Sequence, residues 1–241
     1  MKTNIDLSII IPAYNEQDRI VPALTHTMAF LKRWSGAAEV IVVSDGSKDR
    51  TVDTARGFEG QGAAALRVLH YEPNRGKGYA VRYGMQQGRG AVVMFMDADY
   101  AVPIEYCETG LGLIAAGNDI AIASRAVAGA KITQQQNLPR RISAKVYTWV
   151  QNRYLGIDYP DTQCGFKLFT QTAARTLFAR QRLDSVIFDP EILFLARRKG
   201  YKVAQFPVHW THMPDSRIQY DSLRKSLFVF KELWRIRRLH P

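Results

Sequence analysis

Apolar positions follow two different periods along the first half of the chain. Short runs rich in valine and isoleucine predict buried parallel strands at residues 7–11, 39–44, 66–71, 91–96 and 119–124. Between the first two runs, Ile20, Leu24, Thr27, Leu31 and Trp34 recur at the spacing of one helix face. Strands that alternate with helices in this way predict an α/β fold with a doubly wound, mostly parallel sheet.

The pattern changes after residue 125. Residues 126–139 have no clear period, which indicates a mobile loop that could act as a lid. The following pattern predicts a helix, a short strand, two helices and a strand, at residues 140–155, 165–169, 170–181, 189–199 and 201–208. A long helix is expected at the C-terminus. We find no internal repeat and no linker composition, so we expect one domain over residues 1–241.

Polar residues follow several of the predicted strands at once. Asp97 and Asp99 come directly after the run at 91–96, and Asp45 follows the second strand. Pro12, Tyr14 and Glu16 follow the first. Ligands of such sheets bind beyond the carboxyl ends of the strands, so we expect these residues to converge on one crevice.

Each of these signals has a functional and a structural interpretation. An Asp-x-Asp pair at a strand end suits Mg²⁺ or Mn²⁺, yet it could be a loop with an aspartate at a helix N-cap. Asp45 could accept hydrogen bonds from a base or a ribose, or Asp45-Gly46 could form a tight turn with Asp49 as a helix cap. Tyr14 could stack on a nucleobase or only shape its turn.

Gly76-Lys77-Gly78 predicts a helix start with a flexible backbone and one cation. The glycine spacing fits neither the P-loop nor the dinucleotide-binding fingerprint. Lys77 is nevertheless a candidate contact for a nucleotide sugar.

Composition adds a strong positive charge. The 33 lysines and arginines against 22 acidic residues give a net charge of +11, which favours nucleic acid, anionic lipid surfaces or phosphorylated ligands. There is no long apolar run, no signal-peptide layout near the N-terminus and no cysteine framework, so we expect a cytoplasmic protein with free thiols. A nucleic-acid-binding module would leave the strand-end carboxylates unexplained.

The predicted C-terminal helix is basic and amphipathic. One stripe combines Leu223, Leu227, Phe230 and Trp234, and basic residues flank it at Arg224, Lys231, Arg235 and Arg238. Such a helix can lie in a bilayer interface, or it can pack on the sheet with a solvated basic side. The aromatic segment 145–155 has the same two interpretations.

The ordered motifs resemble those of the family 2 glycosyltransferases, which have the GT-A fold. The motifs are PAYNE at 12–16, SDGSKDRT at 44–51, NRGKGYAVRYGM at 74–85, MDADY at 96–100 and ASRA at 123–126. DTQCGFKLF at 161–169 and FDPE at 188–191 resemble the polyprenyl- or dolichyl-phosphate β-glucosyltransferase branch, with mannosyltransferases as near relatives. The resemblance covers about residues 5–235. It implies a nucleotide-sugar half over 1–125 and an acceptor half over 126–241.

The resemblance implies roles for individual residues. The expected nucleotide-sugar contacts are Pro12, Tyr14, Glu16, Val43, Asp45, Asp97 and Ala98. Asp99 is the expected ligand of Mg²⁺ or Mn²⁺, with Asp97 and His212 as further candidates. The expected catalytic residues are Asp97, Asp99, Arg125 and Arg217, with the two arginines near the phosphates. Arg125, Arg140, Arg141 and Ser143 are expected near an acceptor phosphate.

Four further polar residues could position the sugar or acceptor, or anchor the arginines. They are Asp161, Gln163, Asp189 and Glu191, and a salt-bridged core is their structural alternative. Two positions depart from the patterns of the relatives: Ala101 replaces a glutamine ligand of the mannosyltransferases, and Met213 replaces an arginine that the relatives have before the closing loop. His209 and His212 need not face the same side, which disfavours a zinc site.

These implications predict an inverting transferase at the cytoplasmic face of an anionic membrane surface. The expected donor is UDP-glucose and the expected acceptor a polyprenyl or dolichyl phosphate. GDP-mannose as donor and a saccharide as acceptor are the alternatives.

Overall fold

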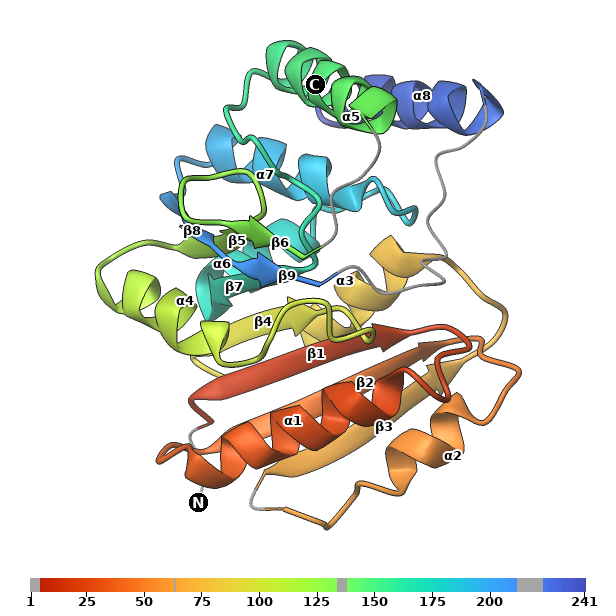
Figure 1. Ribbon diagram of the computed structural model, residues 1–241, viewed down its shortest axis with the longest axis vertical. Helices are drawn as coiled ribbons and strands as arrows, with labels where there is room; N and C mark the ends of the chain where they lie inside the picture. Colours follow the sequence, from red (N-terminus) through yellow and green to blue (C-terminus); the bar gives the residue numbers. More distant parts are fainter. Residues whose placement is uncertain (1–4, 63, 134–137, 212–222) are drawn as a thin grey trace.

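A seven-stranded sheet forms the centre of the computed structural model, which describes residues 5–62, 64–133, 138–211 and 223–241 (Figure 1). At residues 138–142, 144 and 223–227 it describes the backbone alone. The strand order is β3-β2-β1-β4-β7-β5-β8. The strands are β1 Leu7–Ala13, β2 Ala38–Asp45, β3 Ala65–Tyr71, β4 Val92–Met96, β5 Ile120–Ser124, β7 Phe166–Thr170 and β8 Val203–Pro207.

The predicted doubly wound sheet is confirmed, with one strand reversed. Strands β1 to β4 pair in parallel, as do β5 and β8, whereas β7 runs antiparallel to β4 and β5. A short apolar strand carries no signal of its direction, so the reversal of β7 comes from the path of the chain.

Helices cover both faces of the sheet. They are α1 Ile20–Arg33, α2 Thr51–Arg56, α3 Lys77–Gln87, α4 Tyr106–Ala115, α5 Leu138–Leu155, α6 Gln171–Phe178, α7 Phe188–Arg198 and α8 Leu223–Leu239. Because side chains alternate along a strand, Ile9 and Ile11 join the core under α1 and α4, and Ile10 joins the core under α3, α6 and α7.

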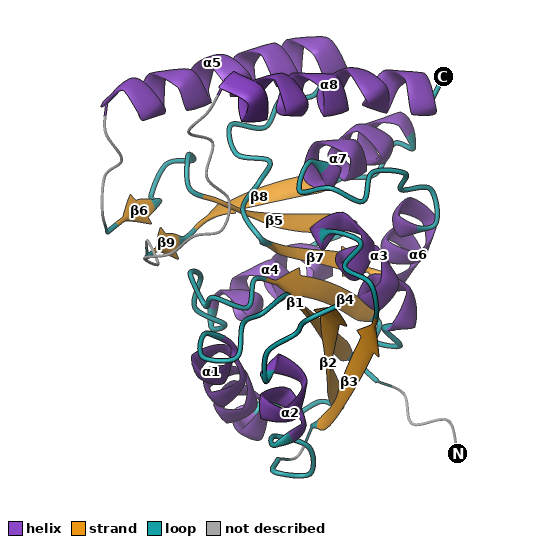
Figure 2. Cartoon of the chain, turned by 90° about the vertical axis from the view of Figure 1, so that its right-hand side faces the viewer, coloured by secondary structure: helices purple, strands orange, loops and turns teal. Residues whose placement is uncertain are grey.

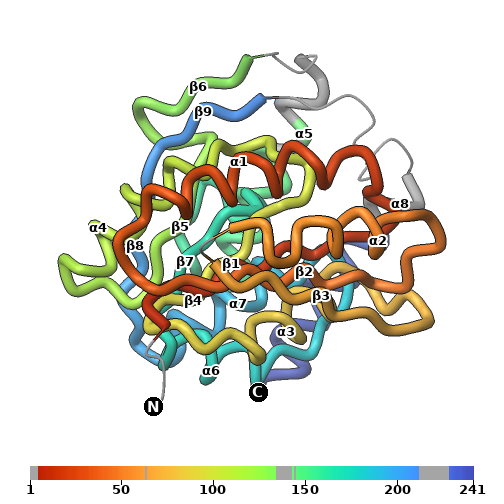
Figure 3. Tube along the Cα trace, turned by 90° about the horizontal axis from the view of Figure 1, so that it is seen from below, coloured from red at the N-terminus to blue at the C-terminus, as the bar shows by residue number. Residues whose placement is uncertain are grey.

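The prediction of an irregular loop over 126–139 is wrong in part. Strand β6, Lys131–Ile132, pairs in parallel with β9, His209–Trp210, at one edge of the molecule (Figure 3). The pairing is anchored by hydrogen bonds from Lys131 N to Val208 O and from Thr133 N to Trp210 O. A two-residue strand is too short to show a period, and its partner is far away in sequence.

Helices α5 and α8 lie side by side as an outer layer beyond α7 (Figure 2). Helix α8 packs through Val229, Leu233 and Ile236, which are all buried. Phe230 and Trp234 remain about half exposed, at 43% and 52%. The helix therefore does pack on the domain, as one alternative held, but onto α7 and α5 and through a face other than the predicted aromatic stripe. In the part of the chain that the structure describes, no helix is long and apolar enough to cross a membrane.

Candidate functional site at the carboxyl ends of the strands

The loops after β1 and β2 are tied to each other. Asn15 N donates to Ser47 Oγ at 3.0 Å, and Lys48 N donates to Asn15 Oδ1 at 2.7 Å. Glu16 N donates to Thr51 Oγ1 at 2.7 Å. Because β1 is also the parallel neighbour of β4, three of the predicted strand ends share one edge of the sheet. The expected convergence is therefore confirmed.

Asp45 organises the loop that leads into α3. Its carboxylate accepts hydrogen bonds from Asn74 Nδ2 at 2.9 Å, Arg75 N at 2.7 Å and Gly76 N at 2.9 Å. The side chain is 3% exposed. Gly46 follows with φ +66°, so the chain bends sharply after Asp45. The helix-cap part of the structural alternative is wrong, because the N-cap residue of α2 is Arg50 and not Asp49. Most of the hydrogen-bonding capacity of Asp45 is thus used on the protein, and its main action on a ligand would be to hold this loop.

Helix α3 begins with an ion pair to the strand-end carboxylates. Lys77 Nζ lies 2.7 Å from Asp97 Oδ1. Gly76 precedes it with φ +102°, and a Cβ at that position would lie 2.4 Å from the carbonyl oxygen of Asp184. Glycine is therefore required for the helix to start close enough to place Lys77 beside Asp97.

Asp97 and Asp99 occupy the turn that follows β4. Asp97 N donates to Gly165 O at 3.0 Å, and a Cβ on Gly165 would lie 2.1 Å from the Asp97 carboxylate. Asp99 Oδ1 accepts a hydrogen bond from Ala101 N at 3.1 Å. The N-cap alternative for these aspartates is wrong, because α4 begins at Tyr106 and its N-cap residue is Glu105.

The electrostatics of this turn favour a bound cation. Burial and the neighbouring carboxylate of Asp97 raise the pKa of Asp99 above its ordinary value. Burial alone would lower the pKa of Lys77, but Asp97 and Asp189 outweigh it and raise that pKa, so the lysine stays charged. Lys77 therefore compensates Asp97 more directly than Asp99.

The donor set fits a hard divalent metal ion. Two carboxylates that leave most coordination positions to water and a diphosphate are the usual protein contribution to Mg²⁺ or Mn²⁺. Within the described ranges there is no cluster of three or more histidine, cysteine or acidic side chains that would hold a metal ion by itself. The site therefore suits a metal ion that arrives with its substrate.

Arg125 is fixed by Asp161 in a two-pronged ion pair. Its Nε and Nη2 lie 2.7 and 2.8 Å from the two carboxylate oxygens, and its backbone N–H donates to the same carboxylate at 2.9 Å. Although burial raises the pKa of Asp161, Arg125 holds it below its ordinary value. Of the two roles expected for Asp161, anchoring an arginine is the one observed. Among the described residues, Nη1 of Arg125 has no hydrogen-bond partner, which leaves it for a ligand. The guanidinium lies 5.5 Å from the Trp210 ring.

Lys167 and Asp189 form a second, buried ion pair. Lys167 Nζ is 2.6 Å from Asp189 Oδ1 and donates to Cys164 O at 2.7 Å. Burial raises the pKa of Asp189 although Lys167 and Lys77 lie beside it. Sequence reasoning missed Lys167. The available signal was a lysine inside the apolar strand FKLF, since a buried lysine needs a partner.

Glu191 belongs to a different part of the molecule. Its carboxylate accepts hydrogen bonds from Arg182 N and Leu183 N and lies 2.6 Å from His240 Nε2. It is fully buried. Of the roles expected for Glu191, the salt-bridged core is the one observed, because it ties the end of α8 to the loop before α7.

Other predicted site residues differ in exposure. Pro12, Val43 and Ala98 are buried, and the Val43 side chain belongs to the core under α3, which leaves its backbone as the part that could meet a nucleotide. Tyr14 is 36% exposed, which suits a stacking role.

Glu16 and Gln163 are held by neighbouring residues of the site. Glu16 pairs with Arg19, whose charge offsets a small part of the rise in the pKa of Asp99. Arg19 was not anticipated from the sequence. Gln163 N donates to Asp161 Oδ1 at 3.2 Å.

Some predicted residues lie outside the described part of the chain. These are His212, Met213 and Arg217. Arg140 and Arg141 belong to the first turns of α5, where the backbone alone is described, and Ser143 is exposed on the same helix.

The family model "Glycosyl transferase family 2" matches residues 8–178, the segment that carries the strand-end site. This segment is more than half of the chain and includes the carboxylate pair after β4. The chain therefore belongs to family 2 of the glycosyltransferases.

The chain is also similar to particular members of this family. It is 38% identical over 227 residues to a dolichyl-phosphate beta-glucosyltransferase of Drosophila melanogaster, covering 89% of this chain and 70% of the relative. The corresponding protein of Homo sapiens is 33% identical over 224 residues, covering 88% of this chain and 69% of the relative.

Solved structures share the fold. Glucosyl-3-phosphoglycerate synthase from Mycobacterium tuberculosis, in complex with Mn²⁺, UDP and glucosyl-3-phosphoglycerate, aligns with a TM-score of 0.68 at 18% identity, over 98% of this chain and 81% of that one. Mannosyl-3-phosphoglycerate synthase from Rubrobacter xylanophilus aligns with a TM-score of 0.69 at 18% identity, over 98% and 74%. These likenesses establish the GT-A fold.

Proposed function

We propose that this protein transfers glucose from UDP-glucose to a polyprenyl or dolichyl phosphate, with inversion at the anomeric carbon. The observation that carries the proposal is the Asp97–Asp99 pair at the end of β4, held beside Lys77. The branch is supported by the similarity to dolichyl-phosphate beta-glucosyltransferases over most of the chain.

In the donor half of the reaction, the negative charge that develops on the leaving diphosphate must be stabilised. Asp99 would ligate Mg²⁺ or Mn²⁺, which supplies charge stabilisation to the diphosphate when bound. The fold relative from Mycobacterium tuberculosis was solved with Mn²⁺ and UDP together, which supports this assignment. Lys77 keeps the Asp97 carboxylate from adding a net negative charge beside the donor. The loop held by Asp45 would shape the nucleotide pocket together with Tyr14.

The acceptor half needs cations more than a general base. A phosphate monoester is ionised near neutral pH, so its oxygen can attack the anomeric carbon without losing a proton to the protein. The attacking dianion and the donor diphosphate repel each other. Arg125 Nη1 and the basic start of α5 at Arg140 and Arg141 are candidates for reducing that repulsion. Arg217 is proposed to act from the segment before α8.

We propose a peripheral position on an anionic membrane surface, at its cytoplasmic face, and the outer helices support the membrane contact. Trp149 on α5 is 69% exposed, and Phe230 and Trp234 on α8 stand in the same layer. Tyr147 packs edge-on against Phe230, and this contact joins the two helices. Exposed aromatics beside arginines suit the boundary between headgroups and acyl chains.

The donor sugar is the least constrained part of the proposal. Ala101 is buried at the position where the mannosyltransferase pattern has a glutamine ligand, which favours the glucosyl branch. GDP-mannose is the competing donor.

The test is a transfer assay with purified protein, Mg²⁺, a polyprenyl phosphate in detergent and labelled UDP-glucose or GDP-mannose. We expect label in the organic phase with UDP-glucose. Label with GDP-mannose alone would replace the donor assignment. If the protein binds or hydrolyses the nucleotide sugars but neither donor gives lipid-linked label, the assignment of a lipid acceptor would be overturned.

A further inference from the structure

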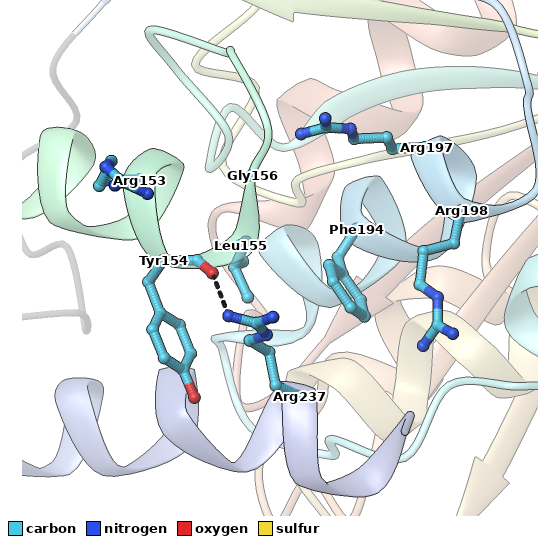
Figure 4. A pocket seen from close by; sticks show the side chains of 8 residues that line it. All are labelled: Arg153, Tyr154, Leu155, Gly156, Phe194, Arg197, Arg198 and Arg237. Atoms are coloured by element: carbon cyan, nitrogen blue, oxygen red, sulfur yellow. Dashed lines mark hydrogen bonds between the residues drawn. The ribbon is translucent and has the colours of Figure 1, made fainter.

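Four arginines surround one open pocket at the far end of the α5–α8 layer. The pocket has a volume of about 390 Å³ and is lined by Arg153, Arg197, Arg198 and Arg237 together with Tyr154, Leu155, Gly156 and Phe194. These residues come from α5, α7 and α8 and from Gly156, which directly follows α5 (Figure 4). We refer to it below as the arginine pocket.

The positions of these arginines are built into the fold. Arg237 Nη1 donates to Tyr154 O at 3.3 Å (Figure 4), and Arg198 Nη1 donates to the main-chain oxygens of His240 and Pro241 at 2.6 and 2.8 Å. Gly156 has φ +65°, and a Cβ there would lie 2.7 Å from Arg197 Nη1. The turn after α5 therefore leaves room for the Arg197 guanidinium.

The charge of the arginine pocket is not balanced by the protein. Among the residues described, none of these four arginines forms an ion pair with a side-chain carboxylate. Three helices, α5, α7 and α8, end at this place. Each helix C-terminus carries roughly half a negative charge, so the three offset about one and a half of the four positive charges. By this count about two and a half positive charges remain, and Arg198 spends part of its charge on the oxygens of His240 and Pro241. The remainder suits a phosphate dianion.

The arginine pocket is separate from the proposed reaction centre. Arg141 and Arg153 are both on α5, twelve residues apart, and a helix rises 1.5 Å per residue, so they are separated by about 18 Å along the axis. It adjoins the exposed aromatics of α8 instead: Tyr154 Oη donates to Trp234 O at 3.3 Å. Arg238 stacks over the Trp234 ring at 4.5 Å.

We propose that the arginine pocket is a second anion site, which binds a phosphate group outside the transfer reaction. Its place beside Trp234 makes the headgroup of an anionic membrane phospholipid the source that best fits. A free phosphate monoester offers the same chemistry, and the experiment separates the two sources. The site would fix the orientation of the protein on the membrane, and its occupancy does not depend on which sugar is transferred.

The test compares two double variants with equal loss of charge. Arg153→Gln with Arg197→Gln removes two pocket arginines whose side chains form no hydrogen bond to the described residues. Arg56→Gln with Arg175→Gln is the matched control, since both residues are exposed in the last turns of α2 and α6. The probes are inorganic phosphate, titrated calorimetrically with UDP present to fill the donor site, and vesicles of phosphatidylcholine with or without phosphatidic acid.

We expect the pocket variant to lose roughly tenfold or more in affinity, relative to the control variant, because each charge-assisted contact contributes about that factor. If the affinity falls only for phosphatidic-acid vesicles, the ligand is a lipid headgroup. If the affinity for inorganic phosphate falls as well, the pocket is a general phosphate site. Equal behaviour of the two variants with both probes would overturn the proposal. Arg153→Lys with Arg197→Lys should restore part of the affinity, which separates a binding defect from a folding defect.

Sugar transfer measured in detergent distinguishes a failure of the second anion site from a failure of the proposed function. The pocket variant should transfer sugar to a detergent-solubilised acceptor within about twofold of the parent. A protein that binds phosphate in the arginine pocket but transfers nothing would contradict the proposed function and leave this site standing.

Discussion

The strand-end site and the outer helix pair differ in how their charged side chains are paired. At the strand ends almost every charge has a partner: Lys77 with Asp97, Arg125 with Asp161, and Lys167 with Asp189. On α5 and α8 the arginines whose side chains are described are exposed. Arg237 binds the main-chain oxygen of Tyr154 and Arg238 lies over the Trp234 ring, while Arg235 pairs with Glu232. Paired charges fix a small ligand in one position, whereas unpaired charges suit an extended anionic surface.

Asp99 is the exception inside the strand-end site, and its replacement should have the largest effect. We expect Asp99→Asn to lower transfer by about a thousandfold, because the diphosphate loses its metal ion. Asp53→Asn, on the exposed side of α2, is the control. Unchanged turnover would rule out Asp99 as the metal ligand.

The same variant should be slightly more stable without metal. A raised pKa means that folding disfavours the charged form, so Asp99 costs stability as pH rises through its ordinary pKa and above. Removing the charge should raise the melting temperature at neutral pH by roughly 1–3 °C. A lower melting temperature would show that the carboxylate supports the fold.

Breaking the Arg125–Asp161 ion pair should lower the stability of the fold, whereas removing the charge of Asp99 should not. Asp161→Asn leaves the Arg125 guanidinium with one good acceptor instead of two. Because Arg125 is about a third exposed, we expect a loss of about 2 kcal/mol rather than the larger values of fully buried pairs, measured by urea unfolding. Transfer should fall roughly tenfold or more as Arg125 loses its orientation.

A double-mutant cycle sharpens this result. If Asp161 acts through Arg125, then Arg125→Gln combined with Asp161→Asn should be no worse than Arg125→Gln alone. Additive losses would mean that Asp161 meets a ligand itself.

The outer helix pair should respond to loss of its aromatics in membrane binding alone. Phe230→Ser with Trp234→Ser should weaken binding to anionic vesicles by roughly tenfold, since each ring contributes apolar burial in the interface. Val21→Ser with Ile132→Ser removes comparable exposed apolar side chains elsewhere and is the control. Equal binding of the two variants in a sedimentation assay would exclude the aromatic face as the contact. Transfer in detergent should not change.

Metal binding should depend on pH through Asp99. A proton on the carboxylate competes with the metal ion, so the Mn²⁺ affinity should fall by up to about tenfold per pH unit below the pKa of Asp99. Because that pKa is raised by burial and by Asp97, the fall should begin at a higher pH than for an ordinary aspartate. Asp97→Asn removes the neighbouring charge and should move the inflection to lower pH. Mn²⁺ binding followed by electron paramagnetic resonance with UDP present checks both statements, and an unmoved inflection would exclude coupling between the two carboxylates.

Sequence periodicity alone determined the sheet, its buried strands and the edge at which the polar residues meet. Strand periods and strand ends are local properties, because alternation and the abrupt appearance of Asp97 and Asp99 are visible within a few residues. The ordered motifs also determined the family, whose model matches residues 8–178.

Tertiary structure alone decided which of those residues are free to act. Asp45 and Glu191 are occupied by backbone N–H groups, and Arg125 by Asp161, through contacts between residues distant in sequence. The sequence did not predict the direction of β7, the β6–β9 pair or the buried face of α8 for the same reason. Amphipathicity marks which positions are apolar, but the choice between Val229–Leu233–Ile236 and Phe230–Trp234 as the packed face depends on where α7 and α5 lie. The arginine pocket exists only because three helix ends meet.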